Sequence, residues 1–187
     1  MIKIRPKFIE NIYRKLKNKR INIIFKLPSS DVIIWEEVSE KIIREYLPSS
    51  KNIFVIKHRE ICVYLEPILL LNLFRNLLKK ELILLMLIDG FKKGFLGYCR
   101  DSLDEAIINQ IKPKIVITFI DNNPRFGRLS SKFKGIKFIA IQNGCRSRWD
   151  TQDVCKHDIY LSFTNQEAKS LSKLGWEIKE AHNVGSI

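Results

Sequence analysis

Apolar residues along this chain change their period repeatedly, and each change separates one expected element from the next. Short runs rich in Ile and Val predict strands, at residues 21–27, 32–35, 53–56, 61–65, 115–120, 136–141, 159–163 and 184–187. Segments with apolar positions three or four residues apart predict helices, at residues 36–47, 102–112, 124–133 and 165–174. Residues 67–98 are apolar nearly all round and predict one broken helix or two. This alternation predicts an α/β fold, Rossmann-like, with a mainly parallel sheet and helices on both faces.

Three of the expected helices carry signals at their ends. Ser102 and Thr164 each stand three residues before a glutamate, which is the spacing of a capping box, so each is expected to begin a helix. Asn123 suits the capping position of a helix whose first residue is Pro124, because proline needs no hydrogen-bond partner there. Gly175 is expected to end the last helix.

The positive charge of the chain is concentrated near its N-terminus. The 187 residues include 33 Lys and Arg and 20 Asp and Glu, giving a net charge of +13. Residues 1–20 hold eight basic residues and one acidic residue, so this segment carries 8 − 1 = +7. Such a charge predicts an anionic partner and leaves nucleic acid, phospholipid headgroups and a phosphorylated substrate open. We therefore divide the chain into a basic N-terminal arm, 1–20, and an α/β domain, 21–187.

Composition also narrows the class of protein. An apolar fraction of 45% excludes a wholly disordered chain. The four Cys form no C-x-x-C pair and do not cluster with the three His, so we expect reduced thiols in a cytoplasmic protein and no metal site. The most apolar segment, 67–91, is interrupted by charges. Its longest uninterrupted apolar run has seven residues, whereas a membrane span needs about 20.

Polar residues follow several of the expected strands. Because parallel strands all end at one edge of a sheet, ligands bind along that edge. We therefore take Asp121 and Asp150 as candidate catalytic carboxylates. The candidate substrate-binding residues are Arg59, Glu60, Asn122, Asn123, Arg125, Gln142, Asn143, Gly144, Arg146, Arg148 and Trp149. The enzymatic interpretation requires the 121–123 and 142–146 clusters to lie at the same edge.

These residues suit the chemistry of an anionic sugar substrate. Arginines bind phosphate or a sugar acid, Trp149 would stack on a sugar ring, and Asp150 would orient hydroxyl groups or act as a base. Structural explanations stay open, since Asp-Asn and Asn-Gly pairs also suit turns and helix caps. For His58 and His157 we favour a structural role over a catalytic one.

Two motifs resemble a known family. Residues 114–124 (KIVITFIDNNP) and 136–146 (IKFIAIQNGCR), followed by the terminal Val-Gly-Ser, resemble the N-terminal half of bacterial surface carbohydrate biosynthesis proteins. That family is similar to two-domain glycosyltransferases of the GT-B type and, distantly, to the polyol-phosphate transferases of wall teichoic acid. Asp121, Asn122 and Asn123 match the first motif. The second motif is matched by Gln142, Asn143, Gly144 and Arg146.

The resemblance implies that this domain holds the acceptor, while a C-terminal domain would hold a nucleotide-activated sugar donor. No other cofactor is implied. The chain stops where that second domain would begin, so we expect it to lack a C-terminal partner domain.

Three functions remain open, and we favour the first. In the first, the chain is the acceptor-side domain of a glycosyltransferase-like transferase in surface polysaccharide biosynthesis. This enzyme would move a sugar or sugar phosphate to a polysaccharide or lipid-linked acceptor. Its basic arm and its apolar segment 67–98 would bind anionic lipid on the inner face of the plasma membrane. The second is a non-catalytic fragment or subunit that needs a partner domain. The third is a nucleic-acid-binding α/β protein, which we favour least because no nucleic-acid-binding motif is found.

Overall fold

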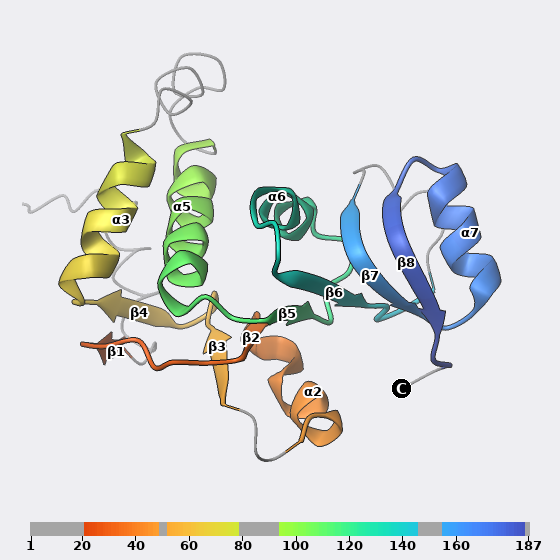
Figure 1. Ribbon diagram of the computed structural model, residues 1–187, viewed down its shortest axis with the longest axis horizontal. Helices are drawn as coiled ribbons and strands as arrows, with labels where there is room; N and C mark the ends of the chain where they lie inside the picture. Colours follow the sequence, from red (N-terminus) through yellow and green to blue (C-terminus); the bar gives the residue numbers. More distant parts are fainter. Residues whose placement is uncertain (1–20, 49–51, 79–93, 146–154, 186–187) are drawn as a thin grey trace, which may run out of the picture.

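The computed structural model describes residues 21–48, 52–78, 94–145 and 155–185. Strands and helices alternate through most of this length (Figure 1). The strands are β1 (Ile21–Ile24), β2 (Val32–Trp35), β3 (Ile53–Ile56), β4 (Ile61–Tyr64), β5 (Ile115–Thr118), β6 (Lys137–Ile141), β7 (Lys156–Ser162) and β8 (Glu177–Asn183). The helices are the 3-10 turn η1 (Glu37–Ser39), α2 (Glu40–Tyr46), α3 (Pro67–Leu77), α5 (Gly94–Ile111), α6 (Pro124–Lys132) and α7 (Asn165–Lys173).

A six-stranded parallel sheet organises the fold, in the order β3-β2-β5-β6-β7-β8. The strands β1 and β4 pair in parallel as a separate two-stranded sheet. From β2 the chain moves to β3 on one side, and from β5 it moves through β6 and β7 to β8 on the other. The strand order therefore reverses between the neighbours β2 and β5, and all six strands end at the same edge. The α/β class and the mainly parallel sheet are confirmed.

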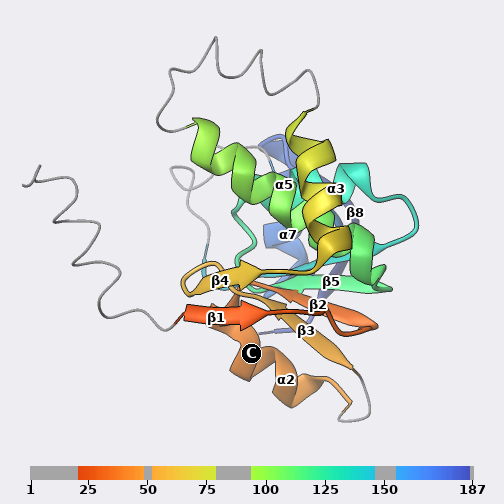
Figure 2. The ribbon, with the colours of Figure 1, turned by 90° about the vertical axis from the view of Figure 1, so that its left-hand side faces the viewer.

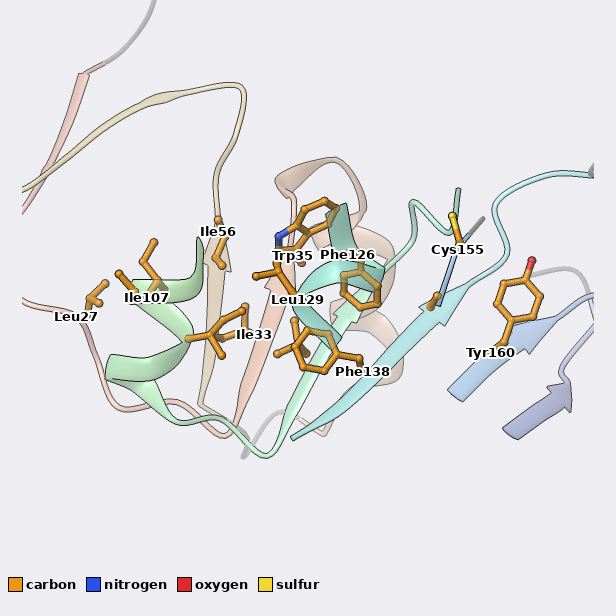
Figure 3. Packing of buried hydrophobic residues seen from close by; sticks show 14 of the residues in the cluster. Leu27, Ile33, Trp35, Ile56, Ile107, Phe126, Leu129, Phe138, Cys155 and Tyr160 are labelled. Atoms are coloured by element: carbon orange, nitrogen blue, oxygen red, sulfur yellow. The ribbon is translucent and has the colours of Figure 1, made fainter. Parts of the chain in front are cut away.

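The two faces of the sheet are covered unequally. Right-handed connections that run in one direction place their helices on one face, and Figure 1 shows α5 and α6 on the opposite side of the sheet from α2. Trp35, Phe126 and Phe138 are fully buried in the core beneath α5 and α6, where their rings touch edge to face or tilted (Figure 3). On the other face Ile43 of α2 packs with Ile34 and its neighbours.

The face that carries α2 has an apolar groove. This groove, about 340 Å³ in volume, lies beside α2 and is lined by side chains of that helix, of β5 to β7 and of the chain after them. No helix in the described part of the chain is long and apolar enough to cross a membrane.

Two helix caps match their predictions, and one does not. The side chain of Asn123 accepts a hydrogen bond from the Arg125 amide at 3.0 Å, and Thr164 accepts one from the Glu167 amide at 3.2 Å. The prediction that Ser102 begins a helix is wrong, because α5 starts at Gly94 and runs through it. Ser102 is buried within α5, and the local spacing of a capping box does not reveal tertiary contacts that extend a helix beyond it.

The last strand lies earlier in the sequence than the hydrophobic pattern predicts. We expected it at 184–187, whereas β8 spans Glu177–Asn183. Its residues are mostly polar and exposed because β8 is an edge strand with β7 on one side only. An apolar run is therefore not required there, and the pattern of hydrophobic residues did not reveal it.

A close contact between α6 and β7 gives a test of this packing. A Cβ atom at Gly127 would lie 2.7 Å from the Lys156 amide nitrogen and 3.0 Å from its carbonyl oxygen. We expect Gly127→Ala to lower the free energy of unfolding by about 1–3 kcal/mol, because backbone must shift to relieve the overlap. Urea denaturation measures the change.

The matched control is Gly97→Ala in α5, where an added Cβ meets nothing within 4 Å. Alanine favours the helix by about 1 kcal/mol, so this variant should be as stable as the parent protein or more stable. Equal stability of the two variants would contradict the packing of α6 on β7.

Candidate functional site

The candidate site lies at the carboxyl edge of the sheet, where β2 and β5 are neighbours. Such a reversal of strand order is where parallel α/β sheets bind ligands. Four elements place side chains here: the end of β2, the loop after β3, the middle of α5 and the start of α6. They bring together Trp35, Glu36, His58, Asp104 and Arg125.

Asp104 is the centre of this cluster. Its residue is fully buried, and its carboxylate receives hydrogen bonds from Trp35 Nε1 at 3.0 Å and Arg125 Nη2 at 3.0 Å. His58 Nε2 lies 3.0 and 3.1 Å from its two oxygens. A buried carboxylate is strongly destabilising unless it is paired and hydrogen-bonded. These three donors therefore hold α5, α6 and two strand ends together.

Arg125 is held by more than Asp104. Its Nε also donates to Asp101, whose other oxygen accepts a hydrogen bond from Arg128 Nη2 at 2.8 Å. Its guanidinium carbon lies 5.5 Å from the centre of the Trp35 ring, a favourable cation–π position. Arg125 therefore pairs with both Asp101 and Asp104, and we assign it to positioning the site.

Glu36 has an unusual backbone conformation at this edge. Its φ is 91° and its ψ is 132°, which is a combination open mainly to glycine and costs about 1–3 kcal/mol in another residue. The Glu36 amide donates to the Ile56 carbonyl at 3.2 Å, so the β2–β3 pairing holds it in place. Its side chain is 13% exposed, and its Oε1 lies 3.5 Å from His58 Nδ1. Strain of this kind is typical of functional sites.

Glu37 fixes the loop that carries His58. Its carboxylate accepts hydrogen bonds from the amides of His58 at 2.8 Å and Arg59 at 2.6 Å. Partial burial acts to raise the pKa of Glu37, but these backbone hydrogen bonds outweigh it and lower that pKa. Glu37 is therefore ionised at neutral pH and sets the position of the imidazole.

His58 lies between two carboxylates. Burial acts to lower its pKa, but the hydrogen bond to Asp104, the nearby carboxylate of Glu36 and the charge of Asp104 raise the pKa of His58 to about 9. The imidazole is therefore positively charged at neutral pH. Nδ1 has no hydrogen-bond partner among the described residues, and at 3.5 Å the Glu36 carboxylate is an electrostatic neighbour rather than a close partner.

A pocket of about 360 Å³ opens beside His58, between β4, α3 and α5. Lys57 and Arg100 line it together with His58, and Glu60 supplies one negative charge. Arg100 Nη2 donates to the His58 carbonyl at 3.3 Å, and Lys57 Nζ lies 3.0 Å from Glu60. The rest of its lining is mostly apolar or weakly polar: Cys62, Tyr64, Leu73, Leu77, Cys99 and Leu103. The pocket thus combines excess positive charge with apolar walls.

The candidate residues after β5 take different positions. Asp121 is fully buried, and its carboxylate accepts a hydrogen bond from the Tyr160 hydroxyl at 2.8 Å. Asn122 is exposed in the turn, and Asn123 caps α6. Of these three, only Asn122 presents an exposed side chain at the sheet edge.

The residues after β6 lie at the same edge, because β5 and β6 are adjacent and parallel. Gln142 is fully buried; its amide donates to the Gly144 carbonyl and to Glu167, and its oxygen accepts from the Phe163 amide. Asn143 is exposed. Arg146, Arg148, Trp149 and Asp150 lie outside the described residues.

The candidates after β3 lie closest to the cluster. Arg59 is exposed in the loop that Glu37 holds, and Glu60 pairs with Lys57 and with the Asn22 amide. Glu36 and Asp104 were not among the residues predicted from the sequence, and His58 was expected to have a structural role. A pair of glutamates directly after a buried strand was a signal for Glu36, whereas nothing local distinguished Asp104 within its helix.

Comparisons of the chain with protein-family models, curated proteins and solved structures find no match. Among the described residues no group of three His, Cys, Asp or Glu side chains is arranged to hold a metal ion. Any function assigned to this chain therefore depends on the geometry of this site.

The charge of His58 can be tested by titration. In the parent protein we expect the free energy of unfolding to fall as pH rises from about 6.5 to about 9, because folding raises the pKa of His58 from 6.5 to about 9. Asp104→Asn should lower that pKa and remove this part of the pH dependence. NMR titration of the His58 ring and urea denaturation across this range measure both effects.

His157 provides an internal control, because burial lowers its pKa to about 4 and it contacts Phe126 and Trp176 instead of this cluster. Its titration should be unchanged in Asp104→Asn. An unaltered pKa of His58 in that variant would exclude Asp104 as the group that holds its proton.

The strain at Glu36 can be measured with two substitutions. Glu36→Ala removes the carboxylate and keeps the strained backbone, whereas Glu36→Gly removes both. We expect the glycine variant to have the higher free energy of unfolding, by about 1 kcal/mol, because glycine adopts positive φ without steric cost. If alanine proved as stable as glycine, the positive φ of Glu36 would be refuted.

Proposed function

We propose that this chain is the acceptor-binding part of a transferase that moves a sugar or sugar phosphate from a nucleotide-activated donor to a hydroxyl group. The observation that carries the proposal is the strained Glu36 beside the His58–Asp104 pair, at the strand reversal of a parallel sheet. The motifs at 114–124 and 136–146, which resemble surface carbohydrate biosynthesis proteins, support the same substrate class.

Glu36 is the group we assign to proton removal. Its side chain is partly exposed, and its Oε1 lies 3.5 Å from Nδ1 of His58. A protonated imidazole cannot itself accept a proton, so His58 acts as the electrostatic partner of Glu36, and Asp104 holds its orientation. Proton transfer to a positioned carboxylate raises the reaction rate about 10²–10⁴-fold.

The proposed reaction is a substitution at the donor. The acceptor hydroxyl gives its proton to Glu36, and its oxygen forms a bond to the anomeric carbon or the phosphorus of the donor. The bond from that atom to the leaving nucleotide breaks, and the nucleotide departs with the electron pair. This chain would supply the acceptor and its base, and a partner domain would hold the donor.

The pocket beside His58 is the proposed place for the acceptor. Lys57, His58 and Arg100 give it more positive than negative charge, which favours an acceptor that carries phosphate or a carboxylate. We therefore expect glucose 1-phosphate, used as a probe, to bind more tightly than glucose. Arg100→Gln should weaken the binding of glucose 1-phosphate about tenfold, since a charge-assisted hydrogen bond is lost.

NMR titration of the labelled chain measures this binding through the signals of His58 and its neighbours. Arg44→Gln is the control, since Arg44 is an exposed arginine that pairs with Glu40 on α2 and does not line this pocket. Glu36→Gln should keep the binding and lose transfer, measured as nucleotide release from sugar nucleotides. Equal affinity for glucose and glucose 1-phosphate, or transfer that survives Glu36→Gln, would refute the assignment.

A further inference from the structure

Most of the exposed large apolar side chains in the described part of the chain lie at one end of the molecule. Of the fourteen exposed large hydrophobic residues in the described part of the chain, nine belong to β1, β4, α3 and the residues directly after them. Figure 2 shows this end facing the viewer. We call these nine residues the apolar end: Ile23, Phe25, Val63, Leu65, Ile68, Leu70, Leu71, Phe74 and Leu78.

Helix α3 is apolar on both of its sides. Its inner side carries Leu69, which is fully buried in the core. Its outer side carries Leu71 and Phe74, followed by Leu78 directly after the helix, and these are 50%, 59% and 65% exposed. A surface helix normally turns charged residues outward, whereas Arg75 is the single charged side chain of α3. Packing within the domain therefore does not explain why the outer side of α3 is apolar.

The two-stranded sheet continues the exposed apolar surface. Ile23 and Val63 are directly opposite in the register of β1 and β4, so their side chains lie on the same side. Phe25 and Leu65 follow two residues later and are 70% and 45% exposed. Tyr64, on the other side of the sheet, is buried in the core. The outward side of this small sheet is thus apolar at four positions.

Positive charge is attached to this same end. Residues 1–20, with a net charge of 8 − 1 = +7, are joined directly to β1 at Ile21. Lys26 and Arg75 are exposed within or beside the apolar end. Apolar side chains combined with a cluster of basic residues suit the interface of an anionic bilayer, where the apolar groups enter the acyl boundary and the cations meet the headgroups.

We propose that the apolar end docks on the surface of an anionic lipid bilayer. Leu73 and Leu77, on the inner side of α3, line the pocket beside His58. Docking therefore places that pocket next to the bilayer surface. The proposal does not depend on the transferase assignment, since it rests on the exposed residues and the charge alone.

Vesicle sedimentation of the full chain tests this docking. We expect binding to vesicles of phosphatidylcholine mixed with phosphatidylglycerol to exceed binding to phosphatidylcholine alone about tenfold, and to weaken as salt is added. The double variant Leu71→Ser, Phe74→Ser should lose about tenfold in partition onto the mixed vesicles, because two side chains no longer enter the bilayer.

Leu174→Ser is the matched control, because Leu174 is 40% exposed and follows α7 at the other end of the molecule (Figure 1). It should bind vesicles like the parent chain. Circular dichroism checks that all variants are folded. Equal binding to neutral and anionic vesicles, or unchanged binding of the double variant, would overturn the proposal. A concentration-dependent dimer that the double variant dissolves, without vesicle binding, would assign the apolar end to a second copy and also overturn it.

Discussion

The buried carboxylate of Asp104 constrains the arrangement of this domain. A fully buried ionised group costs several kcal/mol unless donors surround it, and here the donors come from β2, the loop after β3 and α6. Removing one donor leaves a charge without full compensation, so these three donors favour the observed position of α5. The core beneath it, with Trp35 against Phe126 and Phe126 against Phe138, is built around the same point.

The parallel sheet places the cluster around Asp104 at its carboxyl edge. Because β2 and β5 send their connections in opposite directions, their ends leave room at the carboxyl edge. Glu36 lies in this space with a positive φ, which is unfavourable for a residue other than glycine. Two sets of hydrogen bonds hold this conformation. The amide of Glu36 completes the pairing of β2 with β3. The carboxylate of Glu37 holds the loop after β3 by accepting hydrogen bonds from two of its backbone amides. The strain at Glu36 is thus balanced by ordinary hydrogen bonds around it.

The charged cluster around His58 and the exposed apolar residues occupy separate parts of the domain. The pocket beside His58 lies between β4, α3 and α5, whereas the apolar end lies on the outward sides of α3, β1 and β4. Helix α3 belongs to both, since Leu73 and Leu77 line the pocket and Leu71 and Phe74 face outward. One helix therefore connects the proposed acceptor pocket with the proposed lipid surface.

Local features of the sequence were sufficient for much of the fold. The strand Val32–Trp35 matches its apolar run, and Asn123 and Thr164 cap their helices because a cap needs only the next two or three residues. The same reasoning failed at Ser102, which has the spacing of a cap but is buried inside α5. It also missed β8, whose edge position needs no apolar pattern.

Periodicity and parallel pairing were enough to predict the α/β class, most strand positions and the common edge of the polar clusters after β5 and β6. Only the tertiary structure revealed the candidate site. Trp35, His58 and Arg125 are 69, 46 and 21 residues away from Asp104, so no spacing along the chain relates them. Likewise, the sequence indicated an apolar segment at 67–98, and only the position of α3 at one end of the molecule revealed which of its side chains are exposed, because no described element covers its outer side.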